Sequence, residues 1–380
     1  MARVSRLDVF TVRLPFRFSF GHALAERRSS TNIAVRLRLD DGTVGFGEGV
    51  PRAYVTGETP DTAIAAIESF HAPVLLGRAL ADAGDVADAA AELPPVHPAA
   101  RCAVELALLD AGGRHLGLPV SHWLGGASAP VVEYDAVLPF VGRGLVTPIA
   151  VALLALGPRK VKVKVGRDLE AEARALITLR RVLGPGADLR VDANCAWGEA
   201  EALRALEKLR PAGISAVEQP LPPGDLEAHA RLTAAIPETL VADESLLGIE
   251  DAEALAAGRA CDAFNIRVSK CGGLLPSLEI ARVAARNGLA CVVGAQVGES
   301  GILSAAGRHL AAAIRPRYLE GSPGRLLLRE ELVAEAVAPG RRGRARTPHG
   351  SGLGVTVRED VLHRLGTLHR SLSPELAAAW

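Results

Sequence analysis

The sequence contains very little lysine. Of its 380 residues only five are lysine, and arginine supplies the remaining 38 of the 43 positive side chains. Three of the five lysines, Lys160, Lys162 and Lys164, stand in one short run, RKVKVKVG. Arginine keeps its charge above about pH 12, whereas a buried lysine can lose its proton and act as a base. A position that stays lysine in such a chain is therefore a candidate for acid–base chemistry.

Other absences exclude whole classes of protein. The five cysteines are scattered and form no CxxC pair, which favours a reducing compartment and argues against a zinc site. Positive and negative side chains balance at 43 each, so no net charge favours binding to nucleic acid. The chain has no long apolar segment, and we expect a cytoplasmic protein that does not enter a membrane. The basic run RRGRAR (341–346) is interpreted as a solvated loop rather than a phosphate-binding patch.

The first third of the chain predicts a separate α+β domain. A chain of 380 residues exceeds the size at which a single core stops growing, so a large and a smaller domain are expected. Strand-like alternation runs from residue 3 to about 50, with a turn at Asp40-Asp41-Gly42. Apolar residues then recur at helical spacing over Thr59–Leu76 and Pro98–Leu116. Strands followed by helices favour an α+β capping domain over 1–125.

After residue 130, short β-branched runs alternate with Ala- and Leu-rich helical stretches. Eight such units predict an α/β fold with a (β/α)8-type TIM barrel over 126–344, followed by a tail, 345–380, that packs on the first domain. A doubly wound open sheet is the rival architecture, but no GxGxxG or Walker loop follows any of the strands. The predicted strands are VVEYDAV, KVKVKVG, LRVDAN, AVEQP, LVADES, AFNIRVS, ACVVGAQ and RYLEG.

Four consecutive predicted strands end in charged residues. Lys164, Asp192, Glu218 and Asp243 follow one another at spacings of 28, 26 and 25 residues, which is one strand–helix unit each time. We therefore expect them together at the carboxyl ends of the strands, where barrel enzymes place catalytic groups. Converging carboxylates repel one another unless a cation neutralises them, and hard oxygen ligands suit Mg²⁺, with Mn²⁺ as an alternative. The competing interpretation is that each acid caps the helix that follows it.

The lysine-rich run predicts a strand with a charged inner face. Successive residues in a strand point to opposite faces, so Lys160, Lys162 and Lys164 share one face and the valines share the other. An exposed edge strand protected by lysines is the alternative, but a closed barrel has no edge. We expect Lys164 near the mouth as the base, and Lys162 one layer below, where its charge would depress the pKa of Lys164.

These motifs resemble the enolase superfamily, and within it the muconate-lactonizing branch. The resemblance rests on KVKVG, VDAN, VEQP, ADES and CGG, and it extends from GEG (47–49) through ARCAVELALLDA (100–111) to GLGV (352–355). It implies that a carboxylate substrate binds Mg²⁺, that a lysine removes the proton α to that carboxylate, and that the metal stabilises the enolate.

The resemblance also implies roles for individual residues. Asp192, Glu218 and Asp243 would bind the metal, Lys164 would be the base and Lys162 its modulating partner. Asn194 and Glu244 would support the metal ligands. The loops around Phe18–Arg28 and Pro51–Glu58, the latter with Tyr54 and Thr56, would close over the substrate.

Three departures separate this chain from most relatives. Where the family pattern NIKxxKxGG offers a second catalytic lysine, this chain has Arg267, and strand alternation would turn Lys270 away unless the chain bends. On the eighth strand a single acid, Glu320, stands where dipeptide epimerases have an Asp-x-Asp pair. No histidine follows the seventh strand, where Glu299 stands instead.

The sequence therefore predicts an isomerase or lyase that uses a single base. Racemisation needs a base on each face of the enolate, and an arginine serves poorly as one. A one-base cycloisomerase or a syn-eliminating dehydratase is favoured, and a racemase or epimerase of an amino-acid derivative or dipeptide is the alternative. A non-catalytic barrel that only binds a carboxylate would have no use for Lys164 in place of arginine. We expect a small carboxylate substrate and a homo-oligomer.

Overall fold

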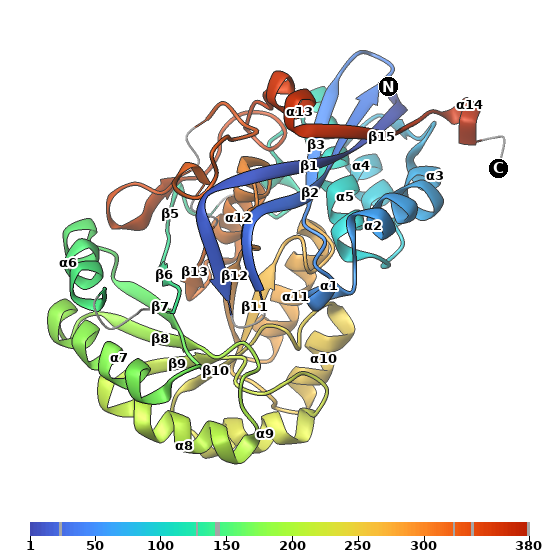
Figure 1. Ribbon diagram of the computed structural model, residues 1–380. Helices are drawn as coiled ribbons and strands as arrows, with labels where there is room; N and C mark the ends of the chain where they lie inside the picture. The colour runs from blue at the N-terminus through green and yellow to red at the C-terminus, as the bar shows by residue number, and fades with distance from the viewer. Residues whose placement is uncertain (23–24, 127, 141–144, 322–323, 336–337, 378–380) are drawn as a thin grey trace.

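The computed structural model describes residues 1–22, 25–126, 128–140, 145–321, 324–335 and 338–377. Figure 1 shows two parts side by side: an antiparallel sheet with helices against it, and a curled parallel sheet with helices around its outside. None of the helices described combines the length and the apolar character that crossing a membrane requires. All five cysteines are free.

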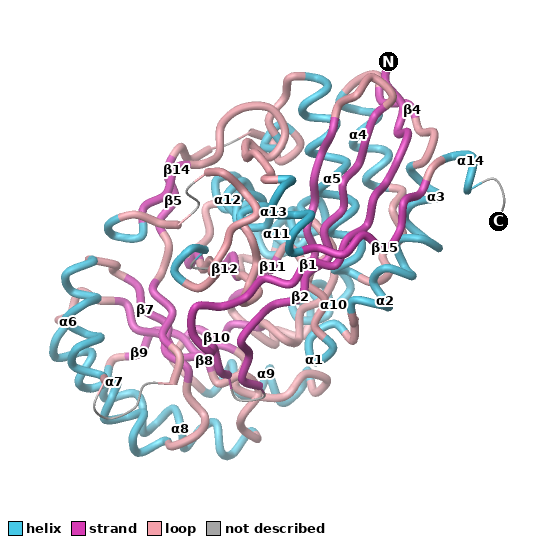
Figure 2. Tube along the Cα trace, turned by 45° about the horizontal axis from the view of Figure 1, so that its top comes forward, coloured by secondary structure: helices cyan, strands magenta, loops and turns pink. Residues whose placement is uncertain are grey.

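The antiparallel sheet has the strand order β15-β1-β2-β3, with β4 paired to β1. The turn predicted at 40–42 is confirmed, and Gly42 has the left-handed φ of 90° that such a turn favours. The loop expected around 18–28 belongs instead to a long β1–β2 hairpin that reaches toward the curled sheet (Figure 2), and residues 23–24 lie outside the described residues. The strands are β1 (Ala2–His22), β2 (Ala25–Leu39), β3 (Val44–Gly49), β4 (Ala79–Leu80) and β15 (Gly366–Leu372).

The first helices of the chain lie against this sheet. The helix predicted over 98–116 is confirmed as α5, which begins at a proline and ends at Gly117 in a left-handed conformation. The helix predicted over 59–76 is divided into α2, the π-helical η1 and α3. The elements are α1 (Ala53–Thr56), α2 (Pro60–Ala66), η1 (Ile67–His71), α3 (Ala72–Leu75), α4 (Ala83–Ala91), α5 (Pro98–Leu116) and η2 (Val120–His122).

Three alternate glycines allow β3 to lie directly on α5. A Cβ atom at Gly45, Gly47 or Gly49 would come within 2.2, 2.0 or 1.9 Å of a backbone atom of α5. Only glycine, which has no side chain, lets the two backbones approach this closely. The GEG motif therefore has a packing role, and it directs Glu48 to the opposite face of β3.

Eight parallel strands, β6 to β13, follow one another in sequence order in the curled sheet, as predicted. Residues 131–133 are an exception, because they form β5 and pair with β14 instead of joining this sheet. The predicted domain boundary at residue 344 coincides with the first residue of β14. The strands are β5 (Val131–Glu133), β6 (Ala136–Leu138), β7 (Lys160–Lys164), β8 (Asp188–Asp192), β9 (Ile214–Glu218), β10 (Thr239–Ala242), β11 (Ala263–Arg267), β12 (Ala290–Gly294), β13 (Tyr318–Leu319) and β14 (Arg344–Arg346).

The two edges of the curled sheet, β6 and β13, lie near each other (Figure 1). No strand ladder pairs them within the described ranges, but the Asp135 nitrogen donates a backbone hydrogen bond to the Leu319 oxygen at 2.7 Å. The structure thus has an eight-stranded curled sheet, and complete closure into a barrel stays a prediction.

Helices cover the outside of the curled sheet, which requires an apolar outer face on each strand. On β7, Val161 and Val163 are buried in the main hydrophobic core, whereas the lysines contact residues inside the curl. The predicted orientation of this strand is therefore confirmed. The helices are α6 (Val146–Leu156), α7 (Leu169–Leu183), α8 (Glu199–Leu209), η3 (Arg210–Ala212), α9 (Leu226–Ala235), α10 (Ile249–Ala257), α11 (Leu274–Arg286) and α12 (Gly301–Ile314).

Buried carboxylates connect the two parts of the molecule. Glu48 of β3 accepts hydrogen bonds from the backbone nitrogens of Ser300 (3.0 Å) and Leu303 (3.2 Å) at the start of α12. Glu105 of α5 accepts one from the Leu274 nitrogen at the start of α11. These carboxylates satisfy backbone N–H groups that the helices leave without a partner. Burial nevertheless raises the pKa of both to about 7.

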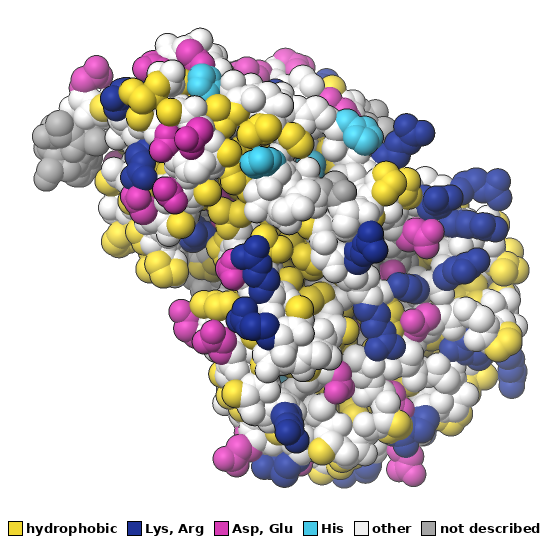
Figure 3. Space-filling model, turned by 180° about the vertical axis from the view of Figure 1, so that it is seen from behind, with side chains coloured by type: hydrophobic (Ala, Val, Ile, Leu, Met, Phe, Trp, Pro, Cys, Tyr) yellow, Lys and Arg dark blue, Asp and Glu magenta, His cyan; other side chains and the backbone are white. Residues whose placement is uncertain are grey.

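The end of the chain returns to the first sheet, because β15 pairs with β1. The basic run lies at the surface: Arg341, Arg342, Arg344 and Arg346 are all exposed, in keeping with a solvated segment. Figure 3 shows Lys and Arg side chains gathered on one flank of the molecule seen from behind. The remaining elements are η4 (Gly324–Leu326), η5 (Arg341–Gly343), α13 (Glu359–Leu365) and α14 (Pro374–Ala377).

The contact between β3 and α5 generates the first testable prediction. Gly47→Ala should lower the midpoint of thermal unfolding by about 1–4 °C, because overpacking against a backbone typically costs about 1–3 kcal/mol and a chain of this length has a large entropy of unfolding. Gly186→Ala is the matched control, since nothing lies within 4 Å of the added Cβ. Calorimetry that gave the two variants equal midpoints would contradict the proposed packing role of the glycine.

Candidate active site

The four charged strand-end residues lie on neighbouring strands, as their spacing predicted. The strand register places Lys164 opposite Asp192, and Asp192 opposite Glu218. Asp243 follows the last residue of β10 directly. All four side chains are buried. The curled sheet therefore brings one amine and three carboxylates to the carboxyl ends of four strands.

Lys164 contacts the first carboxylate and its neighbour. Its Nζ donates to Asp192 Oδ2 at 3.1 Å and to Asn194 Oδ1. Asn194, held at a left-handed φ of 45°, donates from its amide to Glu244 Oε1 at 3.1 Å. Burial raises the pKa of Glu244 to about 7, and its second oxygen has no hydrogen-bond partner. Asn194 and Glu244 thus lie beside the candidate ligand and base.

Lys162 lies deeper and contacts three carboxylates. Its Nζ lies 2.9 Å from Glu218 Oε1, 2.7 Å from Glu320 Oε2 and 3.5 Å from Asp192 Oδ2. Burial alone would lower the pKa of Lys162, but these carboxylates raise it well above its usual range. Lys162 is therefore a permanent cation, and its predicted effect on the pKa of Lys164 stays a prediction.

Glu320 is engaged by cations of the protein itself. Its two oxygens accept from Lys162 and from Arg190, at 2.7 and 2.5 Å. Against the opposing effect of burial, these two cations lower the pKa of Glu320 to about 2. Both oxygens of this carboxylate are therefore occupied by side chains of the protein, and Glu320 supports Lys162.

Arg190 was missed in the sequence. It precedes Asp192 by two residues on β8, so strand alternation places both on the inner face, and that signal was available in LRVDAN. Its guanidinium forms ion pairs with Asp135, Glu218 and Glu320.

The prediction that Lys270 turns away from the site is wrong. Its Nζ donates to Asp243 Oδ1 at 2.8 Å, to the Asp243 backbone oxygen at 2.6 Å and to the Asn265 oxygen at 3.1 Å. The physical reason is that β11 ends at Arg267 and a turn follows, so strand alternation no longer applies at Lys270. The side chain is only 1% exposed, and burial lowers the pKa of Lys270 to about 8.

Arg267 lies on the other side of Asp243. One terminal nitrogen contacts Asp243 Oδ2, and the other donates to Gln296 Oε1 at 3.3 Å. Gln296, which the sequence did not indicate, in turn donates its backbone N–H to Glu299 Oε1 at 2.6 Å. Glu299 is buried, and burial raises its pKa to about 8. The strand opposite Lys164 thus presents a guanidinium.

Tyr54 and Thr56, the two residues expected to close over the substrate, both lie in the short helix α1. Tyr54 is 43% exposed, and the guanidinium of Arg27 from the hairpin stacks on its ring at 5.1 Å. The hydroxyl of Thr56 is buried without a hydrogen-bond partner. The hairpin and the 51–58 segment therefore meet at Tyr54, and the predicted contacts with substrate stay predictions.

The three candidate metal ligands offer the oxygen donors that Mg²⁺ prefers. Each is neutralised here by cations of the chain: Asp192 by Lys164 and Lys162, Glu218 by Lys162 and Arg190, and Asp243 by Arg267 and Lys270. Among the residues that the structure describes, no three His, Cys, Asp or Glu side chains are grouped closely enough to hold a metal ion. The oxygen donors of these three residues fit a divalent cation. To bind one, the three carboxylates would have to move closer to one another.

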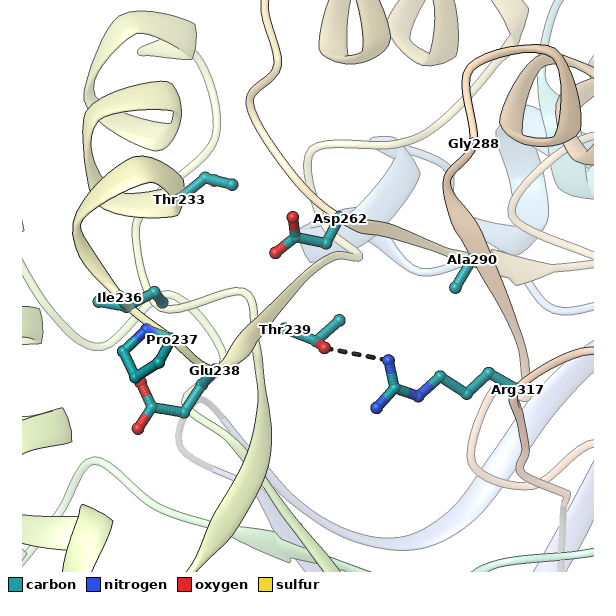
Figure 4. A pocket seen from close by; sticks show the side chains of 9 residues that line it. All are labelled: Thr233, Ile236, Pro237, Glu238, Thr239, Asp262, Gly288, Ala290 and Arg317. Atoms are coloured by element: carbon teal, nitrogen blue, oxygen red, sulfur yellow. Dashed lines mark hydrogen bonds between the residues drawn. The ribbon is translucent and has the colours of Figure 1, made fainter.

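A separate hollow of about 340 Å³ lies at the amino ends of the strands (Figure 4). Its lining includes Thr239 at the start of β10 and Arg317 just before β13, which hydrogen bonds to the Thr239 hydroxyl at 3.1 Å. None of the predicted site residues lines it. Because enzymes with such sheets place chemistry at the carboxyl ends of the strands, this hollow is distinct from the candidate site.

Comparison with known proteins agrees with the geometry. Residues 2–125 match the family described as "Mandelate racemase / muconate lactonizing enzyme, N-terminal domain", and residues 148–361 match "Enolase C-terminal domain-like". The chain is 35% identical to an L-Lys-D/L-Arg epimerase of Methylococcus capsulatus over 93% of this chain and 99% of that protein. It is 32% identical to muconate cycloisomerase 1 of Pseudomonas putida, over 94% and 95% of the two chains.

A solved structure extends the likeness to the fold. The N-succinyl Arg/Lys racemase of Bacillus cereus is 26% identical, with a TM-score of 0.88 over 97% of this chain and 100% of that one. The relatives are isomerases, epimerases, racemases and cycloisomerases. The chain therefore belongs to the mandelate racemase and muconate lactonizing enzyme family of the enolase superfamily, and it is an enzyme.

Proposed function

We propose that this enzyme uses Mg²⁺, or Mn²⁺ in its place, and removes or delivers a proton α to the carboxylate of a small substrate. Within that chemistry we propose a one-base reaction, a cycloisomerisation or a syn elimination. The observation that carries this choice is the asymmetry of the site: an amine, Lys164, stands at the end of β7, and a guanidinium, Arg267, stands at the end of β11.

Asp192, Glu218 and Asp243 would hold the metal. When bound, the metal would supply positive charge that stabilises the negative charge developing on the substrate carboxylate. Arg267 and Lys270 flank Asp243 and add positive charge to the same region.

Lys164 is the group that moves the proton. Its Nζ is positioned by Asp192 and Asn194, and Glu244 in turn orients the Asn194 amide. A positioned amine that takes a proton and returns it on the same face serves both a cycloisomerisation and a syn elimination. A guanidinium is a poor proton acceptor, so Arg267 stabilises negative charge and does not act as a second base. Lys270 is fully enclosed against Asp243, which leaves it no path to a substrate in this arrangement.

Epimerisation of an amino-acid derivative or dipeptide is the second candidate. It is favoured by the 35% identity to a protein named L-Lys-D/L-Arg epimerase. It would need a second base, and Lys270 would then have to leave Asp243.

The division of the chain at 125 and 344 and the expected homo-oligomer also stay proposals.

The metal assignment predicts a stabilisation. Mg²⁺ at about 100 times its dissociation constant should stabilise the fold by about 2.7 kcal/mol, because it binds the folded chain preferentially. Asp243→Asn should remove most of the resulting rise in unfolding temperature, measured by calorimetry. Asp188→Asn, the same change at the amino end of β8, should keep the rise. A chain of natural sequence that showed no response to divalent ions would contradict the assignment.

The assignment of the base predicts a loss of turnover without loss of fold. Lys164→Arg keeps the charge but removes the accessible neutral amine, so exchange of the substrate α-proton should fall by about 10²–10⁴-fold. Lys160→Arg makes the same change on the same face of β7, at its amino end, and should leave exchange near normal. Exchange into D₂O is followed by proton NMR on any carboxylate that the unaltered enzyme accepts. Near-normal exchange by Lys164→Arg would refute the role of this residue.

The guanidinium of Arg267 leads to a prediction about which substrate enantiomer exchanges its α-proton. With Lys164 as the only base, the enzyme should exchange the α-proton of one substrate enantiomer and leave the other unlabelled in D₂O. Arg267→Met should slow this exchange without changing which enantiomer is labelled, because the variant loses electrostatic assistance alone. Arg267→Lys provides an amine on the second face and should permit labelling of both. Rapid labelling of both enantiomers by the unaltered enzyme would favour the epimerase.

A further inference from the structure

Arg190 is a charged side chain in an unusual place for one. It heads the set of largest fully buried side chains and is 1% exposed, inside the curl of the parallel sheet. A guanidinium at such a position is costly unless ion pairs and hydrogen bonds compensate for its lost hydration. Three carboxylates and one aromatic ring provide that compensation, since the guanidinium also lies 4.5 Å above the Tyr318 ring.

The three carboxylates come from distant parts of the sheet. One terminal nitrogen of Arg190 lies 3.0 Å from Asp135, just before β6, and 2.5 Å from Glu320, just after β13. The other terminal nitrogen lies 3.1 Å from Glu218 Oε2 at the end of β9. The side chain thus links the two edges of the curled sheet and at the same time contacts a candidate metal ligand.

The contacts divide the oxygens of two carboxylates between two cations. Oε2 of Glu218 accepts a hydrogen bond from Arg190. Oε1 accepts one from Lys162 at 2.9 Å and one from the Asn265 amide at 3.0 Å. In Glu320, likewise, Oε1 accepts from Arg190 and Oε2 accepts from Lys162. With Arg190 on Oε2, the other Glu218 oxygen, Oε1, lies 4.0 Å from Arg267, and Lys162 Nζ contacts both this oxygen and Asp192 Oδ2. A planar fork with separate donors can hold both carboxylates at once, which a lysine ammonium at the same place would do poorly.

We infer that Arg190 is a positioning residue: it anchors Glu218 through Oε2, so that Oε1 is the oxygen left to bind the metal, and through Glu320 it holds the ammonium of Lys162. In this role it acts through Glu218 and Lys162 and not on the substrate itself. This inference rests on the proposed function, because it assumes that Glu218 is a metal ligand.

The test measures metal affinity without turnover. Mn²⁺ binding to the substrate-free enzyme is followed by electron paramagnetic resonance, together with the thermal unfolding midpoint. Arg190→Met should raise the Mn²⁺ dissociation constant by about 10–100-fold, the usual effect of losing a group that orients a ligand. Arg190→Lys, which keeps the positive charge, should give a smaller rise in the same direction.

Asp135→Asn is the matched control, because it weakens the link across the sheet edges and leaves both Glu218 and Glu320 on Arg190. It should lower the unfolding midpoint and change the Mn²⁺ dissociation constant by less than about twofold. Folded Arg190→Lys with unchanged Mn²⁺ affinity, or an equal loss of affinity in Asp135→Asn, would overturn the inference and leave a purely structural role. Absence of Mn²⁺ binding to the unaltered enzyme would instead overturn the proposed function, and the inference with it.

Discussion

The structure depends on the neutralisation of buried carboxylates inside the curled sheet. Five acids, Asp135, Asp192, Glu218, Asp243 and Glu320, are brought together by the strand order, and each forms an ion pair with a lysine or arginine of the chain. Charges buried this deeply are tolerated only with such partners. The same concentration of oxygen ligands makes the site suited to a divalent cation. The stability of the curled sheet and the proposed metal site therefore depend on one charge arrangement.

The two inner lysines of β7 illustrate how position along a strand determines chemistry. Lys162 lies one layer below the strand end, where three carboxylates hold it as a cation. Lys164 lies at the strand end and forms an ion pair with only one of these acids, Asp192. We expect that arginine could replace neither without loss, but for different reasons: Lys162 fits between three acids, and Lys164, as the proposed base, would need an amine that can lose its proton.

The remainder of the molecule positions this centre. The first part of the chain is held on the ring of helices by carboxylates that accept backbone hydrogen bonds at the starts of α11 and α12. Alternate glycines in β3 bring that strand against α5 and so place Glu48 over α12. The β1–β2 hairpin and the 51–58 segment then meet where the guanidinium of Arg27 stacks on Tyr54. Recognition of the substrate is expected to depend on these two segments.

The sequence by itself determined the features that have a short-range cause. Strand and helix periods predicted helix α5, the eight parallel strands and the inner face of β7, and the regular spacing predicted that Lys164 and three acids lie on neighbouring strands. Only the tertiary structure decided the partners of each charge. A turn after β11 brings Lys270 into contact with Asp243. The two sheet edges approach each other, so that Glu320 and Asp135 both contact Arg190. Residues 131–133 pair with a segment more than 200 residues away. These contacts join residues distant in sequence, and local periodicity contains no information about which distant groups meet.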